Sequence, residues 1–543
     1  MLRVWRYRMS VGLSAGLVAV SSLTLYAFAV WFGNLNQDEG WYLYAATRVA
    51  EGAVPYRDFF FTQGPMMPYV YGLFIKLWHP YGVLGGRVFT VGLGLLGCVL
   101  AAGLARRAVP HSRAMEAGVL AFALTGCNLY HVYFTTIPKT YALASCLLLA
   151  GYLVLSLCIS RRRKMRSMLS CMWALPAGLL IAFAAGTRLS LGALLPVTTL
   201  GLLLMVRRTG SAFFWFALGG GLGLVLVYGP AWLMAPDQFV FGQTYHVARG
   251  GRDWMYLLGS FARSVRAYLP LFLLAAARVI FYLFRGRTRV SQKRTEDPSG
   301  VTYRGELWPW LWAAGFVAVF SVQLASPFPY DDYQVPVMGL FAAAIAGWVV
   351  NAIPVATVRG CVCLVWVSAS LLTSFGSPLI QEWMVHGQDR FWVRRKACSD
   401  LDLLRRTARD IQALSENDPV LLTQDTYLAV EAGLRVPAGL EMGPFSYFPD
   451  LSDDDAERFH VMNATRLTAL LDAAPCRVAA ISGYGYAVRA PVMDQVPDKD
   501  RQRYFSLLGQ HYDRVQEVSD FGQNGTTLYI LKRRTAVTEK PAG

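Results

Sequence analysis

The feature that most constrains this chain is a succession of apolar segments, each about 20 residues long and nearly free of charge. A helix of that length crosses the roughly 30 Å hydrocarbon core of a bilayer. A segment in lipid must satisfy its own backbone hydrogen bonds, so such a chain folds as a bundle of helices. We expect eleven spans, at residues 10–32, 83–105, 114–134, 140–159, 170–187, 189–206, 212–234, 267–284, 306–325, 335–352 and 360–380.

Composition and charge support this interpretation. The chain is 55% hydrophobic and 16% charged, whereas a soluble chain carries about 25% charged residues. The net charge of +16 could suit nucleic acid, but Lys and Arg gather in short clusters such as "RRRKMR" at 161–166. These clusters lie on alternate connecting segments, as in cytoplasmic loops. We therefore expect a multi-pass protein of the inner (plasma) membrane, with a cytoplasmic N-terminus and no nucleic-acid partner.

The residues after about 380 have a different composition. Apolar runs shorten, acids become frequent, and strand-like segments at 419–423, 477–482 and 526–533 alternate with helical patterns at 453–474 and 499–511. We expect residues 1–380 to form the transmembrane domain and residues 381–543 to form a soluble α/β domain. The odd number of spans places that domain on the extracytoplasmic side.

Charged residues also gather on the segments that this topology places outside. The longest is the first loop, residues 33–82, where the carboxylates Asp38 and Glu39 lie among aromatic residues and prolines. Aromatic side chains are stable at the membrane interface, so we expect short helices there. A carboxylate at the bilayer centre would cost about 2.5–3.5 kcal/mol, which puts Asp38 at the water boundary. The other candidate site residues on this face are Arg57, Asp58, Gln63, Lys139, Arg188, Arg249, Arg252, Tyr330, Asp331, Asp332 and Tyr333.

A lipid-linked phosphate substrate would use these groups together. Its tail needs an apolar groove between spans, its phosphate needs Lys or Arg, and transfer of an attached group needs a base. The first loop supplies that base as a carboxylate. Asp331 and Asp332 suit either acceptor binding or capping of the span at 335–352, and we expect capping.

Five stretches resemble a known family. "NQDEG", "RVAEGAVPYRDF" and "QGPMMPYVYGLFIKLW" together look like the first outer loop of the GT-C membrane glycosyltransferases, in the branch of protein O-mannosyltransferases and aminoarabinose transferases of lipid A. "TRLSLGALLP" and "PYDDYQVPVMGLFAAA" resemble later segments of bacterial members. The resemblance implies transfer of a sugar, with inversion, from a polyprenyl-phosphate donor to a protein, lipid or glycan acceptor. It also implies Asp38 as general base, Glu39 as its supporting neighbour and Arg188 as a phosphate contact.

Two positions depart from the family pattern. Many relatives have Lys in "KPP", where this chain has Gln63 and Gly64 in "QGP". Relatives often have a second acid where this chain has Lys139, so a two-acid metal site is not expected and Lys139 becomes a candidate phosphate contact. The sequence assigns no cofactor, and it leaves a divalent metal requirement open.

A polytopic transporter or flippase of lipid-linked substrates is the alternative. Such a protein usually carries acids or bases well inside its spans. Here the spans hold few charges, and Arg278 lies near an inner end where it could snorkel. Polar chemistry on one membrane face favours an enzyme that acts at that boundary.

Overall fold

The computed structural model describes residues 2–160, 171–250, 253–284, 307–380 and 398–534. The chain forms two compact units, each drawn from three stretches. The helical unit comprises residues 1–30, 90–229 and 252–391, and the mixed unit comprises 31–89, 230–251 and 392–543. The first outer loop thus folds with the C-terminal residues. The predicted domain boundary near residue 380 stays a prediction.

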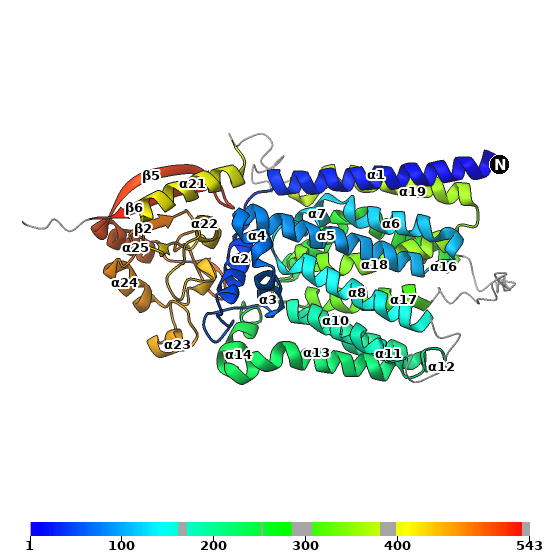
Figure 1. Ribbon diagram of the computed structural model, residues 1–543, viewed down its shortest axis with the longest axis horizontal. Helices are drawn as coiled ribbons and strands as arrows, with labels where there is room; N and C mark the ends of the chain where they lie inside the picture. Colours follow the sequence, from blue (N-terminus) through cyan, green and yellow to red (C-terminus); the bar gives the residue numbers. More distant parts are fainter. Residues whose placement is uncertain (1, 161–170, 251–252, 285–306, 381–397, 535–543) are drawn as a thin grey trace, which may run out of the picture. The chain divides into compact units, whose positions relative to one another are not determined.

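The helices of the helical unit run beside one another (Figure 1). Among the described residues the predicted spans are largely helical, because a segment in lipid must satisfy its backbone hydrogen bonds within itself. The helices that lie wholly or mostly in this unit are α1 (Leu2–Phe32), α5 (Gly82–Arg107), α6 (Ala114–Gly126), α7 (Leu129–Phe134), α8 (Thr140–Ser160), α10 (Ala174–Thr187), α11 (Leu194–Leu204), α12 (Val206–Thr209), α13 (Ala212–Met234), α15 (Trp254–Ala267), α16 (Leu269–Phe284), α17 (Leu307–Leu324), α18 (Val335–Ala352) and α19 (Ala356–Thr373).

By length and composition, six helical stretches among the described residues can cross a membrane. They are Val11–Phe32, Ile75–Arg107, Thr140–Ile159, Ala212–Met234, Asp331–Ala352 and Ala356–Ile380. α15 and α16 make a seventh if the pair, bent by 92°, is one span. Shorter apolar helices lie at Ala174–Thr187, Leu189–Leu204 and Trp308–Leu324. The prediction of a mainly helical, polytopic membrane protein is confirmed.

The fraction of buried residues distinguishes helices in the centre of the helical unit from helices at its periphery. In the apolar stretch that contains α18, 78% of the residues are buried, against 28% in those of α13 and α19. A helix that is apolar on all sides and buried lies in the core of its bundle. α13 instead exposes Leu222, Val225 and Leu226, as a lipid-facing helix does.

The C-terminal part of the mixed unit is built on a four-stranded sheet of order β1-β2-β6-β5. β1 (Leu421–Leu422) runs parallel to β2 (Val478–Ile481), and β6 (Thr526–Arg533) lies antiparallel between β2 and β5 (Tyr512–Phe521). The expected strands are confirmed as β1, β2 and β6. A small second sheet pairs β3 (Val488–Arg489) with β4 (Asp494–Gln495). The helices here are α21 (Asp400–Ser415), α22 (Thr426–Ala432), α23 (Asp453–Arg458), α24 (Ala464–Ala473) and α25 (Asp498–His511).

The helix expected at 453–474 is in fact two helices, α23 and α24. His460 adopts a φ of 56°, in the left-handed region that interrupts a right-handed helix. Asn463 then caps α24, because its side chain accepts a hydrogen bond from the backbone N–H of Arg466. The helical pattern therefore restarts after a turn.

The first loop contains the short helices that its sequence predicts. They are α2 (Gln37–Ala50), α3 (Met66–Leu73) and α4 (Ile75–Trp78). α3 and α4 expose Leu73 and Leu77, the kind of side chain that an interfacial segment offers to lipid. Their position relative to a membrane stays a prediction. α14 (Pro236–Thr244) comes from the middle of the sequence and belongs to the same unit.

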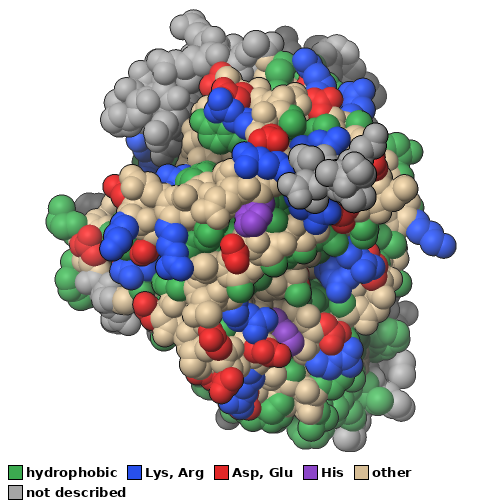
Figure 2. Space-filling model, turned by 90° about the vertical axis from the view of Figure 1, so that its left-hand side faces the viewer, with side chains coloured by type: hydrophobic (Ala, Val, Ile, Leu, Met, Phe, Trp, Pro, Cys, Tyr) green, Lys and Arg blue, Asp and Glu red, His purple; other side chains and the backbone are tan. Residues whose placement is uncertain are grey.

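One face of the molecule carries acidic and basic side chains interspersed with each other (Figure 2). Exposed ion pairs of the mixed unit have this character, including Arg466 with Glu457 and Arg534 with Asp513. Interspersed charge of both signs is typical of a solvated surface.

Candidate functional site

Asp38 and Glu39 lie in the first turn of α2, which begins with a capping box. The side chain of Asn36 accepts a hydrogen bond from the backbone N–H of Asp38 at 3.0 Å. Glu39 Oε1 accepts one from the N–H of Asn36 at 2.7 Å. These bonds fix the start of the helix, where the first N–H groups have no intrahelical acceptor. The sequence "NQDE" therefore places two acids at the positive end of a helix dipole.

Glu39 is fully buried and forms a two-point ion pair with Arg87. Arg87 donates from Nε to Oε2 at 2.8 Å and from Nη2 to Oε1 at 2.7 Å. The same guanidinium donates to the carbonyls of Gly33 and Asn34, at 3.0 Å each. A buried pair with this many hydrogen bonds has its charges compensated, and removal of one partner is costly. The carboxylate of Glu39 thus stabilises the structure of the loop through its bonds to Arg87 and to the N–H of Asn36.

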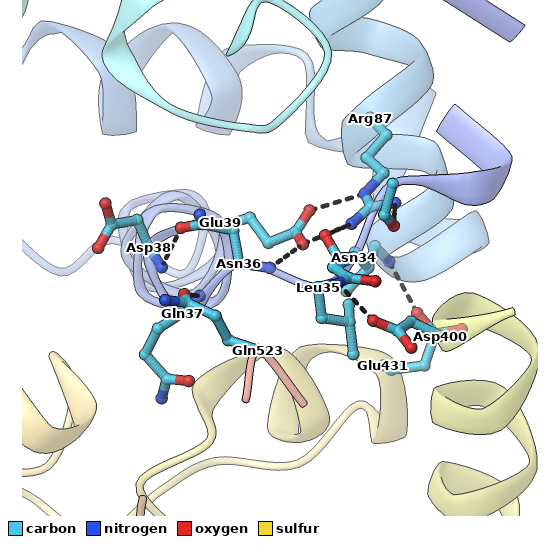
Figure 3. A network of polar contacts seen from close by, with 12 residues as sticks. Asn34, Leu35, Asn36, Gln37, Asp38, Glu39, Arg87, Asp400, Glu431 and Gln523 are labelled. Atoms are coloured by element: carbon cyan, nitrogen blue, oxygen red, sulfur yellow. Dashed lines mark hydrogen bonds and ion pairs between the residues drawn. The ribbon is translucent and has the colours of Figure 1, made fainter. Parts of the chain in front are cut away.

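Asp38 has different surroundings. It is only half-buried, and its Oδ1 accepts a hydrogen bond from Trp41 Nε1 at 3.2 Å. The Trp41 ring lies edge-on to Phe61 and Phe445, with centroids 5.7 and 6.4 Å away. Figure 3 shows the side chains of Asp38 and Glu39 leaving α2 in different directions. Of the two acids, Asp38 is the one that solvent reaches.

Residues of the C-terminal part hold the backbone around this turn (Figure 3). Asp400 Oδ2 accepts a hydrogen bond from the N–H of Leu35, and Gln523 Oε1 accepts one from the N–H of Gln37, both at 2.8 Å. The turn that carries Asp38 is therefore fixed from two distant parts of the sequence.

Arg57 and Asp58 form an exposed ion pair in the same loop. Arg57 donates from Nε to Oδ1 and from Nη2 to Oδ2, at 2.8 Å each. The hydrogen bond from Arg57 lowers the pKa of Asp58, and the N–H of Val54, which donates to Oδ2 at 2.7 Å, acts in the same direction. This pair lies at the surface. The expected role of Arg57 and Asp58 in substrate binding stays a prediction.

Gln63, the residue of the departing "QGP" motif, contacts the segment around α14. Its side-chain nitrogen lies in hydrogen-bonding contact with Nε2 of His246. Its carbonyl accepts hydrogen bonds from the hydroxyl of Tyr56 and, at 3.2 Å, from Nε2 of Gln243. An amide thus stands in a polar setting at this position.

Arg249 follows α14 in the mixed unit and is buried. Its guanidinium lies 5.0 Å from the centroid of the Tyr245 ring, an arrangement typical of a cation over an aromatic face. Arg252 lies outside the described residues, so it stays a prediction.

The second acid pair, Asp331 and Asp332, lies in the helical unit in a short turn of 3-10 helix, η5 (Asp331–Gln334). Asp331 Oδ2 accepts a hydrogen bond from the hydroxyl of Tyr130 at 2.6 Å, and its Oδ1 accepts one from Arg263 Nε at 3.3 Å. Asp332 Oδ2 accepts one from the hydroxyl of Tyr141 at 2.8 Å and lies 3.4 Å from the Nζ of Lys139.

The expected capping role of Asp331 and Asp332 is wrong. The N-cap residue of α18 is Gln334, and no side chain makes a capping hydrogen bond there. Both carboxylates instead contact donors from elsewhere in the helical unit, namely tyrosine hydroxyls and cations.

The cations of this cluster are packed against aromatic rings. The carbon of the Arg188 guanidinium lies 4.1 Å from the centroid of Tyr333 and 5.0 Å from that of Tyr141. Lys139 Nζ lies 5.5 Å from the Phe134 centroid. Both cations are buried. A stacked guanidinium keeps its N–H donors in the plane of the group, where they can bind phosphate oxygens. Tyr330 lies beside this cluster, 5.4 Å from Tyr333 between ring centroids.

Sequence reasoning missed several participants. Tyr141 follows Lys139 by two positions in "PKTY", and that proximity was an available signal. Arg87 is a charged residue inside an apolar segment, which is a reason to expect a buried partner. Gln523 gave no local signal, because it lies 486 positions from Gln37 in the sequence.

The described residues contain no group of three or more His, Cys, Asp or Glu side chains that could hold a metal ion. Four of the acids described above pair with cations, whereas Asp38 accepts a hydrogen bond from the indole of Trp41. A partly exposed carboxylate such as that of Asp38 can accept a proton, and a buried guanidinium such as that of Arg188 can bind an anion.

No protein-family model matches the chain, and no curated protein matches it in sequence. Its structure is similar to that of ArnT, an aminoarabinose transferase from Cupriavidus metallidurans. The apo form aligns with a TM-score of 0.59 at 15% identity, over 96% of this chain and 97% of ArnT. The form bound to undecaprenyl phosphate aligns with a TM-score of 0.57 at 14% identity, over 97% and 98%.

A second similar structure is the oligosaccharyltransferase of Archaeoglobus fulgidus in complex with Zn and sulfate. It aligns with a TM-score of 0.51 at 12% identity, over 96% of this chain and 72% of that protein. At these identities the likeness concerns the fold. The resemblance to GT-C glycosyltransferases is confirmed at that level: the chain has the fold of an aminoarabinose transferase along nearly its whole length.

Proposed function

We propose that the protein is an integral membrane glycosyltransferase that moves a sugar from a polyprenyl-phosphate donor to an acceptor, with inversion. The observation that carries this proposal is the likeness in fold, over 97% of the chain, to a transferase whose structure holds undecaprenyl phosphate. Clustered charges at two places support it, one in each unit. The acceptor is a protein, lipid or glycan that carries a nucleophilic hydroxyl or amine.

The donor phosphate binds to basic residues drawn from Lys139, Arg188, Arg249 and Arg252. Buried cations suit this task, because a phosphate that leaves water needs charge-assisted hydrogen bonds in return. The stacking of Arg188 on two tyrosine rings supports the assignment, since stacking orients a guanidinium before the ligand arrives. The polyprenyl tail lies among the apolar helices.

Asp38 acts as the general base. It takes the proton of the acceptor as the acceptor oxygen or nitrogen bonds to the anomeric carbon from the face opposite the phosphate. The bond between the anomeric carbon and the phosphate oxygen breaks, and its electron pair leaves with the polyprenyl phosphate. The half-buried position of Asp38 supports this role, while the ion pair of Glu39 with Arg87 supports a structural role for Glu39.

The protein acts at the outer face of the inner (plasma) membrane. The basic clusters on alternate segments support a cytoplasmic N-terminus. The C-terminal α/β region then lies on the extracytoplasmic side, together with the loop that carries Asp38.

The test is release of polyprenyl phosphate by the purified protein from a panel of polyprenyl-phosphate sugars. Asp38→Asn keeps the acceptor oxygen for Trp41 and removes the base, and it should lower turnover about 10²- to 10⁴-fold. Glu51→Gln, an acid of the same loop in an exposed pair with Arg48, is the matched control and should keep wild-type turnover. Full turnover by Asp38→Asn would remove Asp38 as base, and release from no donor by the wild type would favour a transporter.

A further inference from the structure

The first turn of α2 receives hydrogen bonds from the C-terminal α/β region. Gln523 lies in the turn between β5 and β6, and its Oε1 accepts a hydrogen bond from the N–H of Gln37 at 2.8 Å. Gln37 is the first residue of α2, so its N–H has no acceptor within the helix. The hairpin therefore supplies an acceptor for this one N–H, in addition to the capping box of Asn36 and Glu39.

Two further contacts reach the same turn from other elements. Asp400, the first residue of α21, accepts a hydrogen bond from the N–H of Leu35 at 2.8 Å. The side chain of Gln37 donates to the carbonyl of Gln424 at 3.1 Å and lies 3.4 Å from Oδ1 of Asp425. Gln37, Gln424 and Asp425 are all buried. Both the backbone and a side chain of the turn are thus bound by the C-terminal residues.

The helix also lies in close contact with α22. A Cβ added at Gly40 would be 2.4 Å from the backbone nitrogen of Tyr427 and 2.7 Å from Oγ1 of Thr426. Real Cβ atoms do not approach backbone so closely, so only glycine permits this packing. α2 therefore contacts the C-terminal region at Gly40 as well as at its first residue, Gln37.

We propose that the C-terminal α/β region positions Asp38, and that Gln523 is a positioning residue for it. This inference rests on the proposed function. Loss of the Gln523 acceptor leaves the capping box in place but frees the N–H of Gln37, which loosens the first turn, and Asp38 is the second residue of that turn. A base displaced by about 1 Å loses up to about 10²-fold in rate, while the binding of a donor held by other residues changes little.

The experiment compares three variants of the full chain with the wild type in lipid nanodiscs, with kcat and KM measured for polyprenyl phosphate release. Gln523→Ala removes the acceptor and should lower kcat by about tenfold with little change in KM for the donor. Gln523→Glu keeps an oxygen acceptor and should restore most of the rate. Gln516→Ala is the matched control, since Gln516 lies on the same hairpin and its side chain contacts exposed Asp410. It should behave as wild type.

Equal kcat values for Gln523→Ala and Gln516→Ala would overturn the proposal, and so would a Gln523→Glu variant as slow as Gln523→Ala. Hydrogen exchange at residues 35–40 separates this result from a failure of the proposed function. If the wild type releases no polyprenyl phosphate, faster exchange there in Gln523→Ala, but not in Gln516→Ala, still supports positioning of the turn. Unchanged exchange would overturn it.

Discussion

Asp38 with Glu39 in the mixed unit, and Asp331 with Asp332 in the helical unit, are alike in sequence and unlike in surroundings. In the first pair, Glu39 forms a buried ion pair with Arg87, while Asp38 is half-buried. In the second, each acid binds a tyrosine hydroxyl and a cation from other elements. The comparison teaches that the role of an acid depends on the hydrogen-bond donors that the fold places around it. The residue next to it in the sequence does not determine that role.

Glu39→Gln should produce the largest loss of stability and would test the structural side of the first pair. The variant leaves the buried guanidinium of Arg87 without a countercharge, which costs about 3–5 kcal/mol. The unfolding midpoint in detergent measures this loss. Glu51→Gln breaks two pairs near the surface, with Arg48 and Arg435, and each pair is worth about 1 kcal/mol or less. Equal losses in the two variants would contradict the difference that we assign to burial.

Glu441 is a buried acid of the mixed unit without the two-point cation that Glu39 has. Burial raises its pKa to about 7, although the N–H of Gly439 donates to it at 2.8 Å. The unfolded chain titrates near pH 4.3, so the folded state binds the proton more tightly. Stability is therefore lost as the pH rises from about 4.3 to 7, by an amount on the order of 3 kcal/mol.

Glu441→Gln should remove this pH dependence. The variant should be more stable than the wild type at pH 8, and the advantage should shrink toward pH 5. Unfolding midpoints measured across that range provide the test. An advantage that stays constant with pH would exclude titration of Glu441 as its cause.

Lys139→Ala would sharpen the description of the second pair. If Lys139 binds the donor phosphate, its loss should weaken donor affinity about tenfold, the value of one charge-assisted hydrogen bond. If Lys139 serves only to compensate Asp332, donor affinity should stay unchanged. Binding of a polyprenyl-phosphate sugar to the variant decides between the two. Lys76→Ala, which alters an exposed lysine of the first loop, is the control.

Arg57→Ala should have the smallest effect, because the pair with Asp58 lies at the surface. Arg57 lowers the pKa of Asp58, so the pair contributes stability above the pKa of an unfolded Asp and loses it as the pH falls. The variant should unfold slightly below the wild type at pH 7, and the two midpoints should converge as the pH falls below the ordinary pKa of an Asp carboxyl. A difference that persists at low pH would point to lost packing instead.

The helices were predictable because an apolar segment in lipid must satisfy its own backbone hydrogen bonds, which it does as a helix. α18 begins and ends at the predicted residues, and β6 does as well. β5 was not predicted, because "YDRVQEVSDF" is a largely exposed edge strand with little apolar signal. Within the candidate site, the sequence pointed to Asp38 and Lys139. It could not show the contacts of Asp331 with Tyr130 or of Gln37 with Gln523, since neither pair is close in sequence.

The interleaved mixed unit has a consequence for biosynthesis. Gln37 and Gln523 are 486 positions apart, so a ribosome that adds about 5–20 residues per second makes the second roughly 25–100 seconds after the first. Throughout that interval the "NQDEG" turn lacks Gln523, and for most of it the turn also lacks Asp400. A chain that stalls late in translation would therefore carry membrane helices already inserted and an Asp38 turn still unassembled, a state that quality-control proteases could recognise.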